Sequence, residues 1–207
     1  MWYQRLFGDT DAFAIQVTLV DDPHPHPGTP RELSASWGRF ALWVDGRCLT
    51  QSSRGGTIHD SIEWYLLPLV QWAAREAVPL LNEEPFPQPT RRSEVATAID
   101  WLSMSEEPPW SLTQAEEYDW LVNRSDWQRR HALWHGFDGA VVPSVMLRRL
   151  GHDVEFSWDN ETWPPSRRDL RFTELTGAAR MPAEAVGRVW GEFVDAVGGQ
   201  IRSRLGM

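Results

Sequence analysis

The chain has 207 residues, of which 42% are hydrophobic and 24% charged, which is typical of one soluble domain with its own core. All 20 basic residues are arginine, which excludes the lysine-dependent phosphate loop, Schiff-base catalysis and an ordinary protein kinase. The net charge of −9 arises between residues 59 and 126, where 13 acidic residues oppose four arginines. An acidic chain repels phosphates, so nucleic acid is not the expected partner.

Cys48 is the single cysteine, so the chain cannot form an internal disulfide. This cysteine usage favours a reducing compartment. The first residues lack the basic and apolar pattern of a signal peptide, and no apolar run approaches the ~20 residues of a membrane-spanning helix. We therefore expect a cytoplasmic protein that makes no membrane contact.

The N-terminal part has the pattern of strands and turns. Residues 12–20 alternate and are rich in β-branched side chains, which predicts a strand. Residues 21–30 contain four prolines and predict a loop. Residues 33–50 predict a meander with a hairpin turn at Asp45-Gly46.

The middle of the chain has mainly helical periodicity. Residues 51–57 predict a flexible loop, and residues 58–81 predict the strongest helix, with Pro68 expected to kink it. Residues 91–103 predict a short helix. Residues 111–136 predict a long helix that ends at a glycine.

The C-terminal part returns to strands and ends in a helix. Residues 145–150 and 154–158 predict a β-hairpin, and residues 170–175 predict another strand. Residues 182–205 predict an amphipathic helix with a proline in its first turn.

This order of elements predicts an α+β fold in which an antiparallel sheet of hairpins packs against about four helices. We expect one domain over residues 1–207. Within it we distinguish a β portion at 1–57, a helical middle at 58–136, and a hairpin with a helix at 137–207.

A first candidate site combines His131, His135 and Asp138. The two histidines are four residues apart near a predicted helix end, so both rings can lie on one face. Two histidines and an aspartate are a legitimate metal set, but residue 132 is alanine where a zinc protease has glutamate. Histidines near a helix C-terminus are also favoured electrostatically without any metal.

Asp153 and Glu155 share a face of the predicted hairpin. Together with Asp138 they can bind a divalent ion. The alternative is that they pair with Arg148 or Arg149 across the hairpin, and we favour this second reading.

A second candidate site is a contact surface at the end of this hairpin, where tryptophans flank polar residues. The alternative is that these tryptophans belong to the core. The candidate partner-binding residues are Arg148, Arg149, Trp158, Asp159, Asn160 and Trp163.

Arginine doublets recur along the chain, and a local basic face remains open as an interpretation although the sequence pI is about 5.1. The doublets are Arg91-Arg92, Arg129-Arg130, Arg148-Arg149 and Arg167-Arg168.

Four segments, at residues 62–69, 130–133, 138–140 and 154–158, resemble the tryptophan-rich region of uncharacterised bacterial proteins, some of which carry ImmA/IrrE-type metallopeptidase domains. The resemblance spans roughly residues 33 to 175, and the His-Glu-x-x-His motif of the peptidase is absent. It implies an accessory or sensing module of a stress or phage-defence system. It transfers no catalytic residues.

These observations together predict a non-catalytic cytoplasmic module that binds a protein partner and needs no cofactor. The alternative is a metal-dependent hydrolase or nuclease that uses His131, His135, Asp138, Asp153 and Glu155. The sequence gives no oligomeric state.

Overall fold

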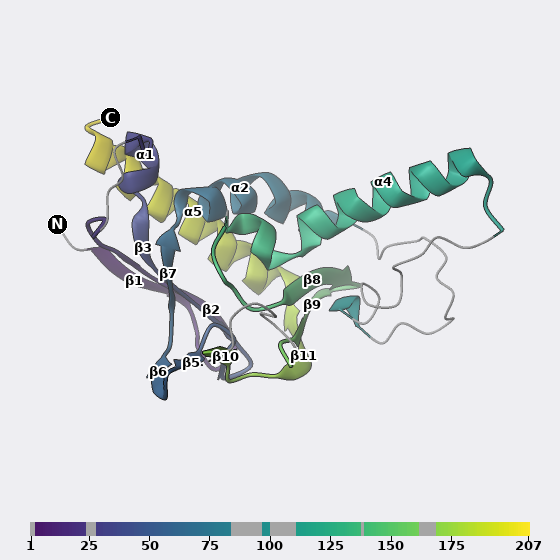
Figure 1. The fold of residues 1–207 in the computed structure, drawn as a ribbon, viewed down its shortest axis with the longest axis horizontal. Coiled ribbons are helices and arrows are strands. Elements are labelled where there is room, and N and C mark those ends of the chain that lie inside the picture. The colour runs from purple at the N-terminus through teal and green to yellow at the C-terminus, as the bar shows by residue number, and fades with distance from the viewer. Residues whose placement is uncertain (1–2, 24–27, 84–96, 100–110, 138, 162–168) are drawn as a thin grey trace.

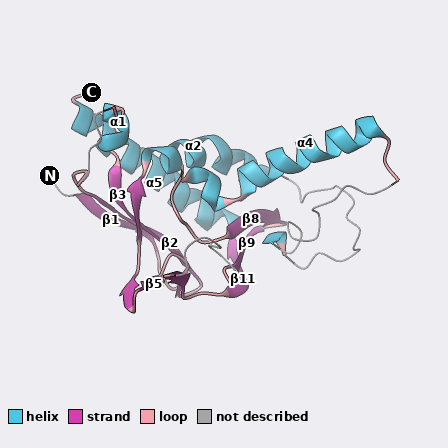
Figure 2. Cartoon of the chain, in the orientation of Figure 1, coloured by secondary structure: helices cyan, strands magenta, loops and turns pink. Residues whose placement is uncertain are grey.

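The computed structural model describes residues 3–23, 28–83, 97–99, 111–137, 139–161 and 169–207. Within them the chain forms three antiparallel sheets and four α-helices, so the α+β prediction is confirmed. The helices gather on one side and the strands on the other (Figure 2). They are α1 (Arg31–Ser34), α2 (Leu67–Asn82), α4 (Gln114–His131) and α5 (Ala183–Leu205), with a 3₁₀ helix, η1 (Leu133–Gly136), after α4. None of these described helices has the length and apolar character to cross a membrane.

The first sheet is a meander whose central strand has partners along both sides. Its strands are β1 (Tyr3–Gly8), β2 (Phe13–Leu19), β3 (Trp37–Val44), β4 (Arg47–Cys48) and β7 (Ile62–Tyr65). The predicted turn at Asp45-Gly46 is confirmed, and both residues have the positive φ of a tight hairpin turn. β2 pairs with β3 along almost its whole length, so β4 and β7 share the opposite side of β3.

The excursion between β4 and β7 forms a second sheet that projects from the body (Figure 1). β5 (Ser52–Arg54) and β6 (Thr57–His59) form a hairpin, and β10 (Leu170–Phe172) joins β5. The prediction of a flexible loop at 51–57 is therefore wrong. Gly55 and Gly56 both have positive φ and supply a two-residue turn. The strands are short and polar, so they lack the alternation that marks a strand.

The helix predicted over residues 58–81 is wrong in its first half. Strands β6 and β7 occupy residues 57–65, and α2 begins at Leu67. Pro68 lies in the first turn of α2 and does not kink it. A proline there costs no hydrogen bond, because the first helical N–H groups have no partner within the helix.

The third sheet contains the predicted hairpin. β8 (Val145–Leu150) and β9 (Asp153–Asp159) pair as expected, and β11 (Thr176–Pro182), which was not predicted, adds to the other side of β9. The strand expected over residues 170–175 is only the three-residue β10. Gly177 on β11 lies against the indole of Trp158, where a side chain has no room.

The core lies between the sheets and the helix pair α2 and α5. The predicted buried stripe of α5 is confirmed, and its Phe193 meets Phe7 and Phe40 from β1 and β3. Trp190 on α5 contacts Trp72 on α2 at 5.8 Å between ring centroids. Each such fully buried aromatic side chain stabilises the fold by roughly 1.5–3 kcal/mol.

α4 leaves this core and projects outward (Figure 1). A capping box between Thr113 and Glu116 starts it. The helix ends at His131, because Ala132 is extended, with φ −97° and ψ 121°. The predicted helix over 111–136 is therefore an α-helix followed by η1. The helix predicted at 91–103 lies outside the described residues except for 97–99.

We expect Gly177→Ala to destabilise the protein by about 1–3 kcal/mol, because the added Cβ would lie 2.4 Å from Cζ2 of the buried Trp158 ring. Gly191→Ala on α5 is the matched control. Its Cβ would meet no atom within 4 Å, so the better helix former should add about 0.5–1 kcal/mol. Urea unfolding measures both changes, and a neutral Gly177→Ala would contradict the packing described.

Candidate functional site

His131 serves as a structural histidine. It is buried, its Nδ1 lies 2.6 Å from the Leu147 carbonyl oxygen, and its Nε2 lies 3.0 Å from a Glu83 carboxylate oxygen. Each ring nitrogen therefore has an oxygen partner within the protein. The imidazole ring also stacks on the Trp127 ring, with 4.2 Å between the ring centroids. Both ring nitrogens of His131 are thus engaged by the Leu147 carbonyl and the Glu83 carboxylate and not directed at a shared metal position.

His135 does not share a helical face with His131. The extended backbone at Ala132 breaks the helix between them, and His135 is exposed on η1. Partial desolvation and the charge of Arg129 lower the pKa of His135. Asp138 lies outside the described residues. Within the described ranges no three His, Cys, Asp or Glu side chains are placed to hold a metal ion.

Glu155 forms the predicted pair across the hairpin. Its side chain is 3% exposed, and Arg148 donates to both carboxylate oxygens, at 2.8 Å and 3.1 Å. The same carboxylate accepts the backbone N–H of Ala98 at 3.0 Å. Glu155 therefore attaches the 97–99 segment to the outer face of the third sheet. Asp153, at the start of β9, is half-buried.

The predicted contact surface at the end of β9 is largely internal. Trp158 is 1% exposed and belongs to the core, so its expected exposure was wrong. Asn160 is buried, where its amide accepts from the Ser144 N–H at 2.7 Å and donates to the Glu174 carbonyl at 2.8 Å. Asp159 is exposed at the strand end.

The other two predicted contact residues add no surface to this region. Trp163 lies outside the described residues. Arg149 donates to the carbonyl oxygens of Leu81 and Gly151. Of the six candidates, the described structure leaves Asp159 as the exposed one.

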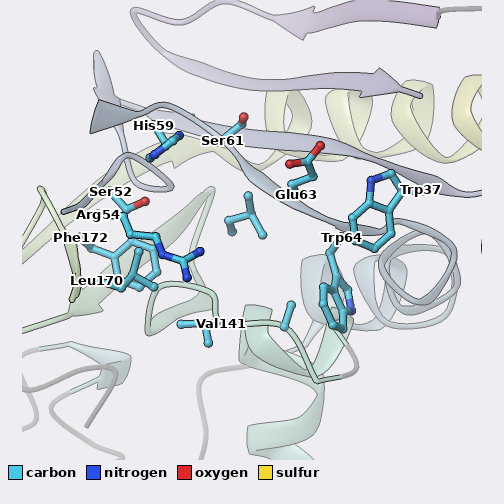
Figure 3. Close-up of a pocket in the computed structure, with 12 residues that line it drawn as sticks. Trp37, Ser52, Arg54, His59, Ser61, Glu63, Trp64, Val141, Leu170 and Phe172 are labelled. Atoms are coloured by element: carbon cyan, nitrogen blue, oxygen red, sulfur yellow. The ribbon is translucent and has the colours of Figure 1, made fainter. Parts of the chain in front are cut away.

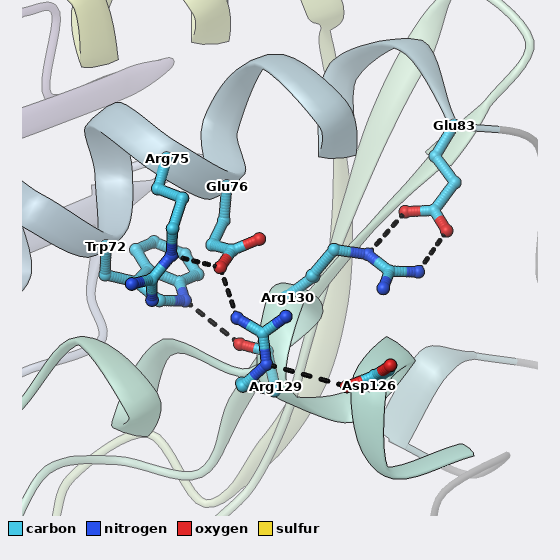
Figure 4. Close-up of polar contacts among 7 residues, drawn as sticks. All are labelled: Trp72, Arg75, Glu76, Glu83, Asp126, Arg129 and Arg130. Atoms are coloured by element: carbon cyan, nitrogen blue, oxygen red, sulfur yellow. Dashed lines mark hydrogen bonds and ion pairs between the residues drawn. The ribbon is translucent and has the colours of Figure 1, made fainter. Parts of the chain in front are cut away.

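The arginines at the end of α4 fasten this helix to α2 (Figure 4). Glu76 is 3% exposed and pairs with Arg75 at 2.6 Å and with Arg129. Arg130 forms a forked pair with Glu83, and Trp72 Nε1 donates to the Arg129 carbonyl at 3.1 Å. These doublet arginines and Arg148 thus meet carboxylates of the same chain, while doublets 91–92 and 167–168 lie outside the described residues.

The surroundings of Glu83 shift the pKa of its carboxyl group strongly. Partial burial raises its pKa, but hydrogen bonds from His131 and Arg130 and their charges outweigh burial and lower the pKa to about 2. Glu83 is therefore ionised at neutral pH and stays ionised as the pH falls through the usual range of a glutamate.

A cleft of about 320 Å³ lies between the projecting second sheet and strand β7 (Figure 3). Arg54 reaches into it from β5, at the end opposite Trp37 and Trp64. Apolar side chains form much of the remaining wall. They are Ile62, Ala140, Val141, Leu170 and Phe172.

The cleft follows the edge of β7 that faces away from β3. The lining includes the consecutive residues 61–64, whose side chains alternate between the two faces of the strand. A cavity that meets both faces must extend past the strand edge. Three aromatic rings lie together at this edge. The ring centroid of Trp37 is 5.9 Å from that of Trp64 and 4.8 Å from that of Tyr65.

The charged groups of the cleft are paired only at the surface. Arg54 meets Asp169 at 3.3 Å, and Glu63 meets Arg39 at 3.6 Å, with every one of these side chains about half exposed. Exposed pairs of this kind are worth at most ~1 kcal/mol, so an incoming charged group can replace either partner.

The polar side chains of the cleft are not arranged as a nucleophile and base. Among the described residues, His59 makes no hydrogen bond to Ser61. Cys48 lies nearby, but its thiol is buried and donates to the Asp60 carbonyl at 3.1 Å, where Thr50 also donates. Burial raises the pKa of the Cys48 thiol.

Sequence reasoning did not identify this cleft. The helix predicted at 58–81 placed Ser61, Glu63 and Trp64 on a helix instead of a strand edge. The local signal that could have corrected this is Pro68, because proline is favoured in the first turn of a helix and therefore indicates that the helix starts there.

We expect Glu83→Gln to flatten the pH dependence of stability between about pH 4.5 and pH 2. A carboxylate whose pKa is lowered on folding stabilises the protein above its unfolded pKa, and this stabilisation is lost as pH falls toward the folded pKa. The pKa shift of Glu83 corresponds to at most about 3 kcal/mol of stabilisation at neutral pH. Solvent screening of this side chain, which is 27% exposed, reduces the expected stabilisation to about 1–2 kcal/mol.

Urea unfolding at a series of pH values measures this effect. Glu192→Gln, which removes an exposed carboxylate on α5, is the control and should keep the wild-type slope. An unchanged slope in Glu83→Gln would show that the cluster with Arg130 and His131 does not stabilise the fold.

Comparison with protein-family models, curated proteins and solved structures gives no match to the chain. Function is therefore inferred from the geometry of the molecule.

Proposed function

We propose that the protein is a non-catalytic interaction module that binds a polypeptide partner in the cleft beside β7. The observation that carries this proposal is the combination, along one open strand edge, of Trp37 and Trp64 with Arg54. Tryptophan, tyrosine and arginine are the residues that most often dominate the energy of protein interfaces.

The distribution of aromatic, apolar and charged side chains in the cleft supports a polypeptide as the ligand. One end offers aromatic rings and the other offers the Arg54 guanidinium, while Ile62 and Val141 lie between them. A peptide supplies apolar and charged side chains at regular spacing along one chain, which matches this distribution.

The use of the titratable groups elsewhere also supports a binding role. His131 and Glu155 are two of the residues on which the enzymatic alternative depends. Their polar atoms form hydrogen bonds within the protein. Groups that are held in this way anchor secondary structure. The resemblance of residues 62–69 and 154–158 to bacterial accessory regions is in line with the same proposal, with a stress or phage-defence system as its setting.

A phage-displayed library of random linear peptides, selected on the purified protein, tests the proposal. We expect enriched peptides whose affinity falls about tenfold or more in Arg54→Glu and in Trp64→Ala. Thermal unfolding of each variant separates lost binding from lost folding, and Arg54 is the safer position because its side chain is more than half exposed.

Two matched controls define the outcome. Arg31→Glu reverses an exposed arginine on α1, and Tyr118→Ala removes an exposed aromatic ring on α4. Both should bind the peptides like the wild type. Enriched peptides that depend on Tyr118 and not on Arg54, or a selection without enrichment, would refute the proposal.

A further inference from the structure

Within the part of the chain that the structure describes, some backbone groups of β7 have no partner and face away from β3. The Leu66 N–H donates to the Ser36 carbonyl at 2.9 Å, which continues the register of β3 and β7. In an antiparallel ladder, directly opposed residues alternate between pairs that exchange hydrogen bonds and pairs that do not. Trp64 and Ile62 therefore bond to β3, whereas the N–H and C=O groups of Glu63 and Tyr65 point outward.

The opposite side of β3 agrees with this alternation. The Val20 N–H donates to the Trp37 carbonyl at 3.0 Å, so Trp37 directs its backbone toward β2 and away from β7. Among the described residues, no backbone hydrogen bond takes the outward groups of Glu63 or Tyr65. β7 is thus an open edge, and the cleft gives an additional strand access to it.

We propose that an extended segment of the partner adds to β7 as a further strand, with its backbone paired to Glu63 and Tyr65. This inference rests on the proposed function, because it names how the cleft holds a polypeptide. Main-chain hydrogen bonds supply affinity in such complexes, and pockets for alternate side chains supply specificity.

The side chains around the edge specify the chemistry of the segment. On one face of β7 an added residue meets Ile62, Trp64 and Val141, so it is apolar. On the other face it lies beside Glu63, where a basic residue is favoured across the strands. The segment therefore alternates apolar with polar residues, and an acidic residue follows at the end where Arg54 enters the cleft.

β1 is a second open edge and provides an internal comparison. The Asp9 N–H donates to the Phe13 carbonyl, so by the same alternation the backbone groups of Gln4 and Leu6 point outward. Gln4 and Leu6 do not line the cleft. Peptide binding should leave their amides unchanged.

Amide hydrogen exchange of the free protein is the first test. We expect the amides of Ile62 and Trp64 to be protected and those of Glu63 and Tyr65 to exchange at least about tenfold faster. Equal protection of all four amides would overturn strand addition whatever the peptide selection yields.

The second test uses a peptide enriched by the selection. Its binding should slow exchange at Glu63 and Tyr65, but not at Gln4 and Leu6. Methylation of its backbone nitrogens, one residue at a time, should weaken binding about tenfold or more at alternate residues only, because every second N–H faces β7.

The outcomes separate the two proposals. A peptide that requires Arg54 and Trp64, but shows no alternation on methylation and does not protect Glu63 or Tyr65, would overturn strand addition and leave the cleft as the binding site. A selection that yields no cleft-dependent peptide would overturn both.

Discussion

The unequal lengths of the strands beside β3 determine where the cleft forms. β2 pairs with almost all of β3, whereas the other side of β3 is divided between β4, at its C-terminal end, and β7, at its N-terminal half. The chain must leave the sheet after β4 and return to it before β7. The β5–β6 hairpin is this excursion, and the cleft is the space between the excursion and the edge to which the chain returns.

Buried carboxylates hold the peripheral elements on this framework. Glu76 and Glu155 are almost completely buried, and each meets arginines, while Glu155 also accepts a backbone N–H. Removing one partner from such a pair leaves a buried charge without compensation, which costs more than the pair itself contributes. At its C-terminal end the projecting helix α4 is held by these polar contacts together with the buried ring of Trp127.

Strong local signals predicted much of the fold. The turn at Asp45-Gly46, the hairpin of β8 and β9, and the amphipathic stripe of α5 each depend on neighbouring residues, so sequence alone identifies them. The apolar run at residues 62–67 fits a helix as well as a strand, and its pairing with β3 decides the matter. Trp158 at a strand end could likewise be core or surface, until Gly177 of the unpredicted β11 covers it.

The cleft was beyond sequence reasoning for a topological reason. The residues that line it come from five separate segments and meet only after the first two sheets and the loop before β8 have assembled; they include Trp37, Arg54, Trp64, Val141 and Leu170. The histidine and carboxylate cluster at 131–155 had the opposite property. It is dense in the sequence, but the structure divides its members between separate hydrogen-bond partners.

The position of the single cysteine gives the protein a built-in probe. Cys48 and Thr50 lie at the start of the excursion, and Asp60 lies at its end. The side chains of Cys48 and Thr50 both donate hydrogen bonds to the Asp60 carbonyl and so hold the two ends of the excursion together. Because Cys48 is only 6% exposed, we expect a thiol reagent to react faster when these hydrogen bonds open. The rate of alkylation at Cys48 therefore reports the local opening of the β5–β6 excursion that faces β7, without any engineered label.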